Sequence, residues 1–231
     1  MIDLEALGGT IAALRPWRHW GAVSAVDSAS LRVSGLGSTA RRGDRVRVEV
    51  PEREPLLAEI IAVNQADAQA MWFGSGEGVA VGDRVWLERQ AGVSPGASWV
   101  GRVVDAFGAP MDGRILASGG RPVPLRRSPP APAARRGLGA RMATGLAVFD
   151  TLLPLARGQR IGLFAGSGVG KSTLLGQLAR GVEADVIVIG LIGERGREVQ
   201  DFVADVLGPP GMAHSVVVAA TSDQSPLAKR Q

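Results

Sequence analysis

The sequence has 231 residues, 45% of them apolar, and its 26 basic and 22 acidic side chains leave a net charge of +4. This is enough for one large domain or two small ones with a buried core, and it excludes a disordered chain. Cysteine is absent, histidine is rare and no apolar run is as long as a membrane-spanning helix, so disulfides, thiolate zinc sites, multi-histidine metal centres and transmembrane helices are excluded. Acidic residues near the N-terminus do not fit a secretory signal, and we expect a cytoplasmic protein.

Residues 1–20 are predicted to form a separate N-terminal tail. Its apolar residues recur at roughly helical spacing, and Pro16 ends the pattern. Two interpretations stay open at this point. The tail is either a frayed terminus that docks on the next domain or a segment that binds a partner protein.

Residues 21–90 are predicted to form a small closed β-barrel. Short segments rich in Val, Ile or Trp alternate with turn residues, which is typical of such barrels. Two of these segments follow Gly-Asp turns, Gly43-Asp44 and Gly82-Asp83, in which glycine supplies the positive φ. The predicted strands are 21–26, 30–34, 45–50, 57–63, 69–73 and 84–88.

Residues 91–141 are predicted to connect the barrel to the rest of the chain. A strand is expected at 101–105 and a turn at 108–113. The Pro- and Arg-rich stretch 126–136 is predicted to be a solvated crossover, because proline keeps it extended. No aromatic residue lies among its arginines, so we expect no specific binding of nucleic acid.

From residue 144 the pattern changes to alternating helices and strands. Thr144 is placed to cap a short helix over 146–153. The following segments predict a parallel sheet, and the continuous apolar run 186–192 predicts a strand that is covered on both faces. The expected strands are 160–164, 186–192 and 215–220, and the expected helices are 171–180 and 197–207, the second closed by Gly208-Pro209.

A phosphate-binding loop connects the predicted strand 160–164 to the predicted helix 171–180. Its glycines allow successive N–H groups to turn toward phosphate oxygens, and the helix N-terminus adds its own free amides. We expect Lys171 to contact the β- and γ-phosphates and Ser172 to ligate Mg²⁺. Ala165 stands where the strict pattern has glycine, which is acceptable at negative φ. The predicted nucleotide-binding residues are Ala165, Gly166, Ser167, Gly168, Val169, Gly170, Lys171, Ser172 and Thr173.

A second candidate group follows the strand 186–192. Ligands of parallel sheets bind at the carboxyl ends of the strands, so Glu194 is expected at the same edge as the phosphate-binding loop. There it could orient the water that attacks the γ-phosphate, while Arg195 steadies the transferred phosphoryl group. The alternative is that Glu194 and Glu198 only favour the start of a helix.

These motifs resemble those of the F1-type ATPases, the ATP synthase alpha/beta family. Within this family, the residues of these motifs are most similar to those of the flagellum-specific ATPases of the flagellar type III protein export apparatus. The resemblance is carried by residues 165–173, 190–199 and 220–223, and it extends over residues 21–231.

The resemblance implies a small N-terminal β-barrel followed by a RecA-like α/β P-loop domain, with the tail at 1–20, the barrel at 21–90 and the ATPase domain at 91–231. It implies ATP and Mg²⁺ as ligands, with Lys171, Glu194 and Arg195 in catalytic roles. It also implies a homo-oligomer, usually a hexameric ring, at the cytoplasmic face of the membrane export apparatus. The implied partners are a stator-like regulatory protein at the tail, the export apparatus, and export substrates or their chaperones.

The family's pattern continues beyond what these 231 residues contain. An apolar strand ending in the aspartate that supports Mg²⁺, an interfacial arginine finger and a C-terminal helical domain are not found in the sequence. We therefore expect a domain that is incomplete at its C-terminus, an open sheet edge after 215–220, and little or no ATP turnover by this chain alone.

Three alternatives stay open. The chain could be a non-hydrolysing binding module of the same family, or an injectisome type III secretion ATPase. An RNA-handling RecA-type ring also pairs a small barrel with a P-loop domain, but the scarcity of aromatic residues disfavours it.

Overall fold

The computed structural model describes residues 19–88, 92–117, 122–125, 128–166 and 168–230. The chain divides into two compact units. The first combines the described residues up to Pro95 with those of 118–125 and 222–230, and the second contains those of 96–117 and 126–221. The predicted tail up to residue 18 lies outside the described residues, and the predicted domain boundaries stay predictions.

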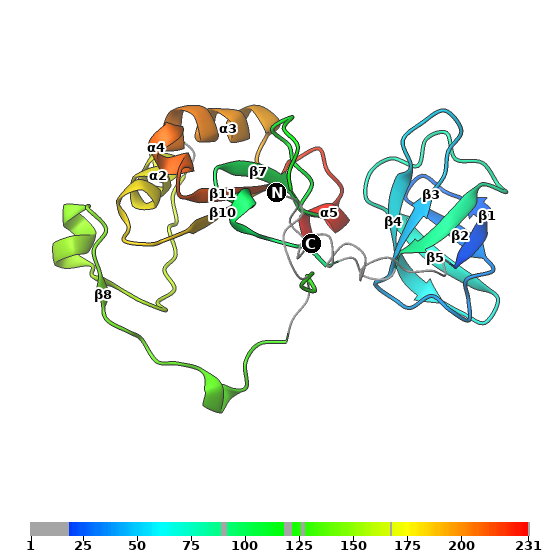
Figure 1. Ribbon diagram of the computed structural model, residues 1–231, viewed down its shortest axis with the longest axis horizontal. Coiled ribbons are helices and arrows are strands. Elements are labelled where there is room, and N and C mark those ends of the chain that lie inside the picture. Colours follow the sequence, from blue (N-terminus) through cyan, green and yellow to red (C-terminus); the bar gives the residue numbers. More distant parts are fainter. Residues whose placement is uncertain (1–18, 89–91, 118–121, 126–127, 167, 231) are drawn as a thin grey trace, which may run out of the picture. The chain divides into compact units, whose positions relative to one another are not determined.

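The first unit contains a closed, antiparallel, six-stranded β-barrel (Figure 1). All six strands predicted in this region are confirmed, because alternating apolar residues fill the interior of a small barrel. Its interior includes the fully buried Leu31, Val46, Ile60 and Trp72. In barrel order the strands are β1 (Trp20–Val26), β2 (Ser30–Ser34), β5 (Asp67–Trp72), β4 (Leu56–Val63), β3 (Arg45–Val48) and β6 (Arg84–Glu88).

The two Gly-Asp turns have the predicted geometry. Gly43 and Gly82 have φ values of 92° and 99°. The carboxylate of Asp44 accepts the N–H of Arg41, and that of Asp83 accepts the N–H of Ala80, both at 2.8 Å. Each turn leads directly into β3 or β6, and these two strands pair with each other.

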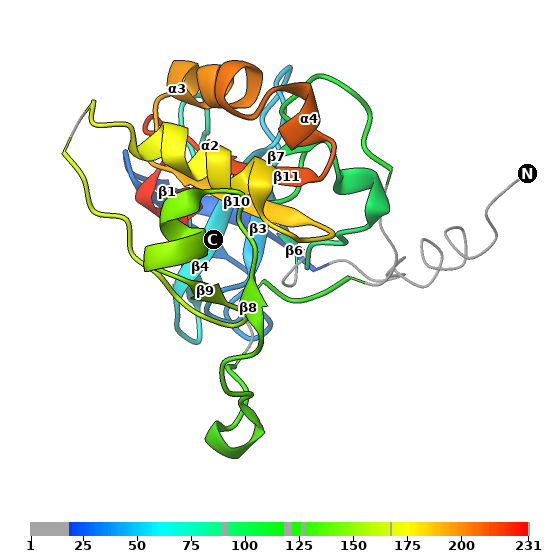
Figure 2. The ribbon, with the colours of Figure 1, turned by 90° about the vertical axis from the view of Figure 1, so that its left-hand side faces the viewer.

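The second unit is built on a three-stranded parallel sheet in the order β10–β11–β7. Its strands are β10 (Ile187–Ile192), β11 (Ser215–Ala220) and β7 (Arg102–Asp105), and the last confirms the strand predicted at 101–105. Helices α2, α3 and α4 lie on one face of the sheet (Figure 1, Figure 2). The helical segments are α2 (Lys171–Gly181), α3 (Gly196–Asp201), its continuation η4 (Phe202–Leu207) and α4 (Gly208–Met212).

The core of this unit lies between the sheet and these helices. Ile189 and Leu191 of β10 pack with Ala179 of α2 and with Phe202 and Leu207 of η4. Helix 171–180 is therefore confirmed. So is the helix over 197–207, which ends where Gly208 takes a φ of 60° and the chain makes one further turn, α4.

Three expectations for the sheet are wrong. Residues 160–164 form no strand in the described part of the chain, and Phe164 is 97% exposed. Strand β10 is covered on one face only, because Val188 and Ile192 remain exposed. Strand β11 is the central strand and not the open edge, since it pairs with β10 on one side and with β7 on the other.

The physical reason for all three is the choice of strand partners. A strand needs a neighbour to satisfy its backbone groups. Strand β7, distant in sequence, fills the place beside β11, and no described segment fills the place beside β10. Residues 160–164 then have no ladder to join.

The segment before the phosphate-binding loop holds a two-stranded ladder, β8 (Arg141–Met142) and β9 (Leu155–Ala156), around η3 (Val148–Leu152). The hydroxyl of Thr144 accepts the N–H of Leu146 at 3.2 Å, but η3 begins only after Ala147 and has no side-chain cap, so the prediction that Thr144 caps this helix is wrong. The remaining segments are η1 (Ala97–Trp99), η2 (Pro132–Ala134) and α5 (Pro226–Arg230). Within the described ranges, every helix is too short or too polar to cross a lipid bilayer.

Candidate functional site

The phosphate-binding loop runs from residue 165 into the first turn of α2. Gly168 and Gly170 have φ values of 78° and 93°, a conformation that favours glycine over all other residues. A Cβ atom at either position would meet nothing within 4 Å, so the backbone of the loop is open to a ligand. Ala165 is not among the described residues with positive φ, so alanine causes no strain there. Ser167 lies outside the described residues.

Three of the predicted site residues line one cavity. Lys171 and Ser172, in the first turn of α2, share a cavity of about 590 Å³ with Glu194, which follows β10. This volume is in the range of small-molecule sites. The amino end of α2, with its unsatisfied N–H groups, opens toward the same region, which favours an anionic ligand.

The residue that follows β10 is held at the sheet edge by its backbone. Gly193 has a φ of 83°, and its N–H donates to the carbonyl of Ala220 at 2.7 Å. This bond continues the β10–β11 ladder by one residue, so Glu194 leaves the sheet at its carboxyl end, as predicted for parallel strands.

Arg195 and Glu198 hold each other at the start of α3. The carboxylate of Glu198 accepts the backbone N–H of Arg195 at 3.3 Å and pairs with its guanidinium at 2.9 Å. Hydrogen bonds from the Arg195 N–H and from the Arg195 side chain hold the pKa of Glu198 below its ordinary value. Glu198 therefore stays ionised and caps the helix.

The alternative reading of this region is thus partly correct. Glu198 does favour the start of a helix, but Glu194 lines the cavity. Arg195 is directed to Glu198 and does not line the cavity, and its predicted contact with a phosphoryl group stays a prediction. The described residues of the predicted nucleotide-binding group other than Lys171 and Ser172 also lie outside the cavity lining.

Two acidic residues of the cavity were not predicted as part of the site. Glu198 and Asp201 join Glu194 along the wall formed by α3. Their spacing of one helical turn places both on the same helix face, and this signal was available in the sequence.

The interior of the same cavity is apolar. It lies between the segment 160–164, the helices above the sheet and the edge of β10. Its apolar lining consists of Ile161, Leu163, Leu175, Leu178, Leu191, Phe202 and Val206. One cavity therefore has a charged mouth, where the phosphate-binding loop and Glu194 meet, and an apolar interior.

Comparison with known proteins identifies the family. Residues 145–231 match the model of the ATP synthase alpha/beta family, nucleotide-binding domain. This part of the chain belongs to the ATP synthase alpha/beta family. The matched range contains the phosphate-binding loop, Glu194 and the whole cavity, so the resemblance inferred from the motifs is confirmed.

Within this family the chain is similar to flagellar and secretion ATPases. It is 40% identical over 230 residues to the flagellum-specific ATP synthase of Caulobacter vibrioides, covering 99% of this chain and 52% of the relative. It is 44% identical over 220 residues to that of Treponema pallidum, covering 93% and 48%. The type 3 secretion system ATPase of Xanthomonas euvesicatoria is 40% identical over 219 residues, covering 93% and 49%.

The chain is also similar to a solved structure. The assembled ATPase EscN of the enteropathogenic E. coli type III secretion system, in complex with its central stalk EscO, superposes with a TM-score of 0.79 at 36% identity. The match covers 90% of this chain and 51% of EscN. The fold class predicted from the sequence, a small barrel followed by an α/β nucleotide-binding domain, is confirmed. The chain spans about half the length of the curated relatives it matches.

Proposed function

We propose that this chain supplies the barrel and the phosphate-binding part of a flagellar protein export ATPase. The observation that carries the proposal is the convergence of Lys171, Ser172 and Glu194 on one cavity, from two elements that are separate in sequence. The names of the relatives, flagellum-specific ATP synthase in several bacteria, support the flagellar role over other members of the family.

Each residue has a role that follows from its chemistry. The ammonium of Lys171 pairs with the β- and γ-phosphates of ATP, and the backbone N–H groups of residues 165–170 donate to phosphate oxygens. The carboxylate of Glu194 orients the water that attacks the γ-phosphate. The guanidinium of Arg195 pairs with Glu198, and when a bound nucleotide replaces Glu198 as its partner, Arg195 offsets the negative charge of the transferred phosphoryl group.

The residues present also fit a magnesium ion. Ser172 places a hydroxyl at the cavity, and the carboxylates there are oxygen donors of the kind that Mg²⁺ prefers. Bound Mg²⁺ neutralises phosphate charge. Ser172 would hold it together with oxygens of the nucleotide.

The proposal extends to assembly. EscN was solved as an assembled ATPase and in complex with its central stalk EscO, and this supports an oligomer and a regulatory partner for this protein. We infer that the ring is hexameric, that a stator-like protein binds the N-terminal tail, and that the assembly works at the cytoplasmic face of the export apparatus on its substrates and their chaperones.

An injectisome role is the second candidate. It is supported by the similarity to the Xanthomonas secretion ATPase and to EscN. Deleting the gene in the source cell separates the two roles: loss of flagellar filaments supports the flagellar role, and loss of needle-dependent secretion with normal filaments supports the injectisome role.

The test of the site uses the two lysines of the chain. Binding of MgATP to the purified chain is measured by calorimetry for Lys171→Ala and for the matched control Lys229→Ala in α5, where the Lys229 ammonium donates to the carbonyl of Ser222. A charge-assisted hydrogen bond is worth roughly 1.5–3 kcal/mol, so Lys171→Ala should weaken binding about 10- to 150-fold. Lys229→Ala should leave it unchanged.

A further variant separates binding from catalysis. Glu194→Gln keeps the volume of the side chain and should bind MgATP as the wild type does. Equal binding by the wild type and Lys171→Ala, or no binding by the wild type at millimolar nucleotide, would refute the proposed site.

A further inference from the structure

The edge of β7 is covered within the chain. The loop after this strand folds back on it: the N–H of Met111 donates to the carbonyl of Val103 at 2.9 Å, and the N–H of Asp105 donates to the carbonyl of Ala109 at 2.8 Å. Because these backbone groups are satisfied, the edge is closed to a further strand and offers no docking site.

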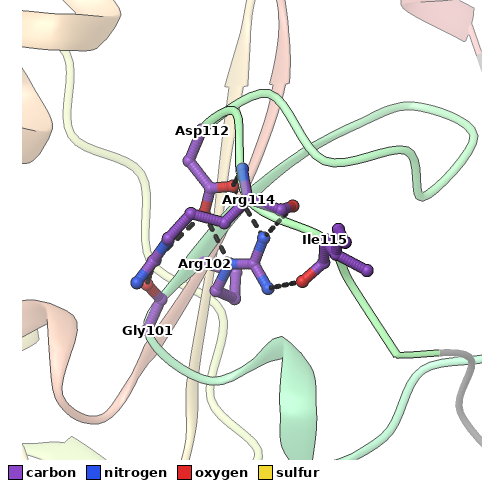
Figure 3. Close-up of polar contacts among 5 residues, drawn as sticks. All are labelled: Gly101, Arg102, Asp112, Arg114 and Ile115. Carbon is purple, nitrogen blue, oxygen red and sulfur yellow. Dashed lines mark hydrogen bonds and ion pairs between the residues drawn. The ribbon is translucent and has the colours of Figure 1, made fainter.

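An ion pair fixes this cover (Figure 3). The guanidinium of Arg102, in β7, donates to both carboxylate oxygens of Asp112, at 2.5 and 2.7 Å. It also donates to the carbonyls of Arg114 and Ile115, at 2.7 and 3.2 Å. Hydrogen bonds from Arg102 hold the pKa of Asp112 well below its ordinary value, so the pair stays ionised. We call this group the Arg102–Asp112 clamp. Since every nitrogen of its guanidinium has an oxygen partner within the unit, its role is structural.

Arg84, in the barrel, is held in the opposite way. Its guanidinium carbon lies 5.2 Å from the ring centre of Trp20 and 5.7 Å from that of Trp86. Indole rings attract the cation, but they leave the five N–H donors of a guanidinium without an oxygen partner. Within the described residues, no oxygen atom accepts a hydrogen bond or forms an ion pair with the Arg84 guanidinium. The side chain is exposed, so these donors are available to a ligand.

Strand pairing places the arginine and both tryptophans on one outer surface of the barrel. Trp20 of β1 stands directly opposite Trp86 of β6, and Arg84 lies two residues before Trp86 on the same strand face. The intervening Val85 is fully buried, so alternation directs Arg84 and Trp86 outward. Trp20 is 55% exposed although it is large and apolar. We call Trp20, Arg84 and Trp86 the barrel platform.

The composition of the barrel platform is typical of a protein interface. Tryptophan and arginine are enriched among the residues that dominate the binding energy of such interfaces. A guanidinium held between two rings has little side-chain freedom left to lose on binding. Its planar edge fits a carboxylate through two parallel hydrogen bonds, as a lysine at this position would not.

The charges around the barrel platform favour a single carboxylate. Arg47, in the adjacent strand β3, pairs with Glu88 at 3.2 Å, so these two charges offset each other. The carboxylate of Asp83 is engaged in its turn, where it accepts the N–H of Ala80. Arg84 therefore contributes a positive charge that no ion pair in the described part of the chain offsets. Nucleic acids and anionic membranes are bound by many cations together, whereas one stacked arginine between apolar rings suits one carboxylate with apolar neighbours.

We propose that the barrel platform is a docking site for a partner protein that presents an aspartate or glutamate beside apolar side chains. The carboxylate pairs with the edge of the Arg84 guanidinium, and the adjoining apolar side chains cover the exposed ring of Trp20. Charge complementarity identifies this occupant, because the stacked cation lacks a partner and the surface that frames it is apolar. The inference goes beyond the proposed ATPase function and uses none of the nucleotide-binding residues.

The test selects the partner's chemistry without assuming its identity. A phage-displayed library of random dodecapeptides is first depleted on immobilised Arg84→Gln and then selected on the immobilised full chain. The enriched peptides should share an Asp or Glu flanked by apolar residues. Each is synthesised with this acid and with the corresponding amide, and both forms are titrated against the chain by tryptophan fluorescence. The amide should bind about fivefold or more weakly, as expected for a bidentate pair at an exposed site.

Matched variants locate the site. Arg84→Lys keeps the charge and the aliphatic stem but loses the planar fork, so it should weaken peptide binding about threefold or more. Trp20→Ala removes the exposed ring and should weaken it to a similar extent. Arg32→Gln makes the Arg84→Gln change at another exposed arginine of the barrel, in β2 and outside the barrel platform, and should alter binding by less than about twofold. Arg84→Lys and Trp20→Ala report on the site even if Arg84→Gln unfolds the barrel.

Four outcomes would overturn the proposal. The first two are a selection that enriches no peptide and a set of enriched peptides without a shared acid. The third is binding of phosphatidylglycerol vesicles or of a single-stranded oligonucleotide that Arg84→Gln weakens and Arg32→Gln does not, which would assign the barrel platform to phosphate groups. The fourth is self-association of the chain, measured by sedimentation, that Arg84→Lys and Trp20→Ala abolish, which would show a second copy on the barrel platform.

Discussion

Gly181→Ala tests how firmly the segment before the phosphate-binding loop is attached to α2. Gly181 is the last residue of α2, and a Cβ atom there would lie 2.0 Å from the carbonyl oxygen of Thr144. This is a clash with backbone, and Thr144 is not free to move. Its N–H and its hydroxyl both donate to the carboxylate of Asp150, at 2.9 and 3.0 Å.

The magnitude follows from two opposing effects. Alanine in a helix is favoured over glycine by about 1 kcal/mol. Forcing an extra carbon into a packed site costs roughly 1–3 kcal/mol. The clash is with backbone, so we expect the cost to exceed the gain and the net destabilisation to be about 0.5–2 kcal/mol, which corresponds to roughly 2- to 30-fold faster local opening.

Hydrogen exchange of the α2 amides is the appropriate assay, because the protein has two units and a global transition would mix them. Gly196→Ala, at the first residue of α3 where a Cβ would meet nothing within 4 Å, is the matched control and should slow exchange in α3 or leave it unchanged. The bonds from Thr144 hold the pKa of Asp150 below its ordinary value, so Gly181→Ala should also raise that pKa. Protection of α2 in Gly181→Ala equal to that of the wild type would refute the reasoning.

Two further predictions concern charged groups. Asp112→Asn should lower the urea midpoint of the unit that contains the parallel sheet at pH 7. Because the native pKa of Asp112 is depressed, the loss of stability relative to the wild type is complete above the unfolded pKa of about 3.9. The loss should shrink as the pH falls below that value. A difference that grows on acidification would contradict the clamp. Arg84→Ala should destabilise the barrel by about 1 kcal/mol, because the guanidinium lies 5.2 Å from the ring centre of Trp20 and 5.7 Å from that of Trp86. Urea titration followed by tryptophan fluorescence measures it, with Arg32→Ala in β2 as the control.

The barrel could be predicted from the sequence because its signals are local. Each strand alternates, and each Gly-Asp turn forms its hydrogen bonds within a few residues, as Asp44 does with Arg41 and Asp83 with Ala80. The phosphate-binding loop and α2 are local in the same sense. So is the convergence of Lys171 with Glu194, which follows from the rule that parallel strands share a carboxyl edge.

The errors concern non-local pairing. The apolar residues of 160–164 and 186–192 predict that these segments are buried. They do not indicate which strand lies beside each segment. Strand β7, from the connecting region, occupies the place beside β11, and the place beside β10 remains open in the described residues. Asp201 was not predicted as a site residue for a different reason. Its spacing from Glu198 indicates a shared helix face, but the sequence does not say that this face of α3 lines the cavity.

The Arg102–Asp112 clamp has a consequence for synthesis on the ribosome. Strand β7 emerges more than a hundred residues before its partner β11, since Val103 pairs with Val217. At roughly 5–20 residues per second, an apolar strand waits about 5–20 s for its ladder, during which it is exposed to aggregation. The clamp and the folded-back loop need only residues 102–115, so they can form as soon as this stretch leaves the exit tunnel. They would protect the unpaired strand β7 from aggregation until the rest of the sheet is synthesised.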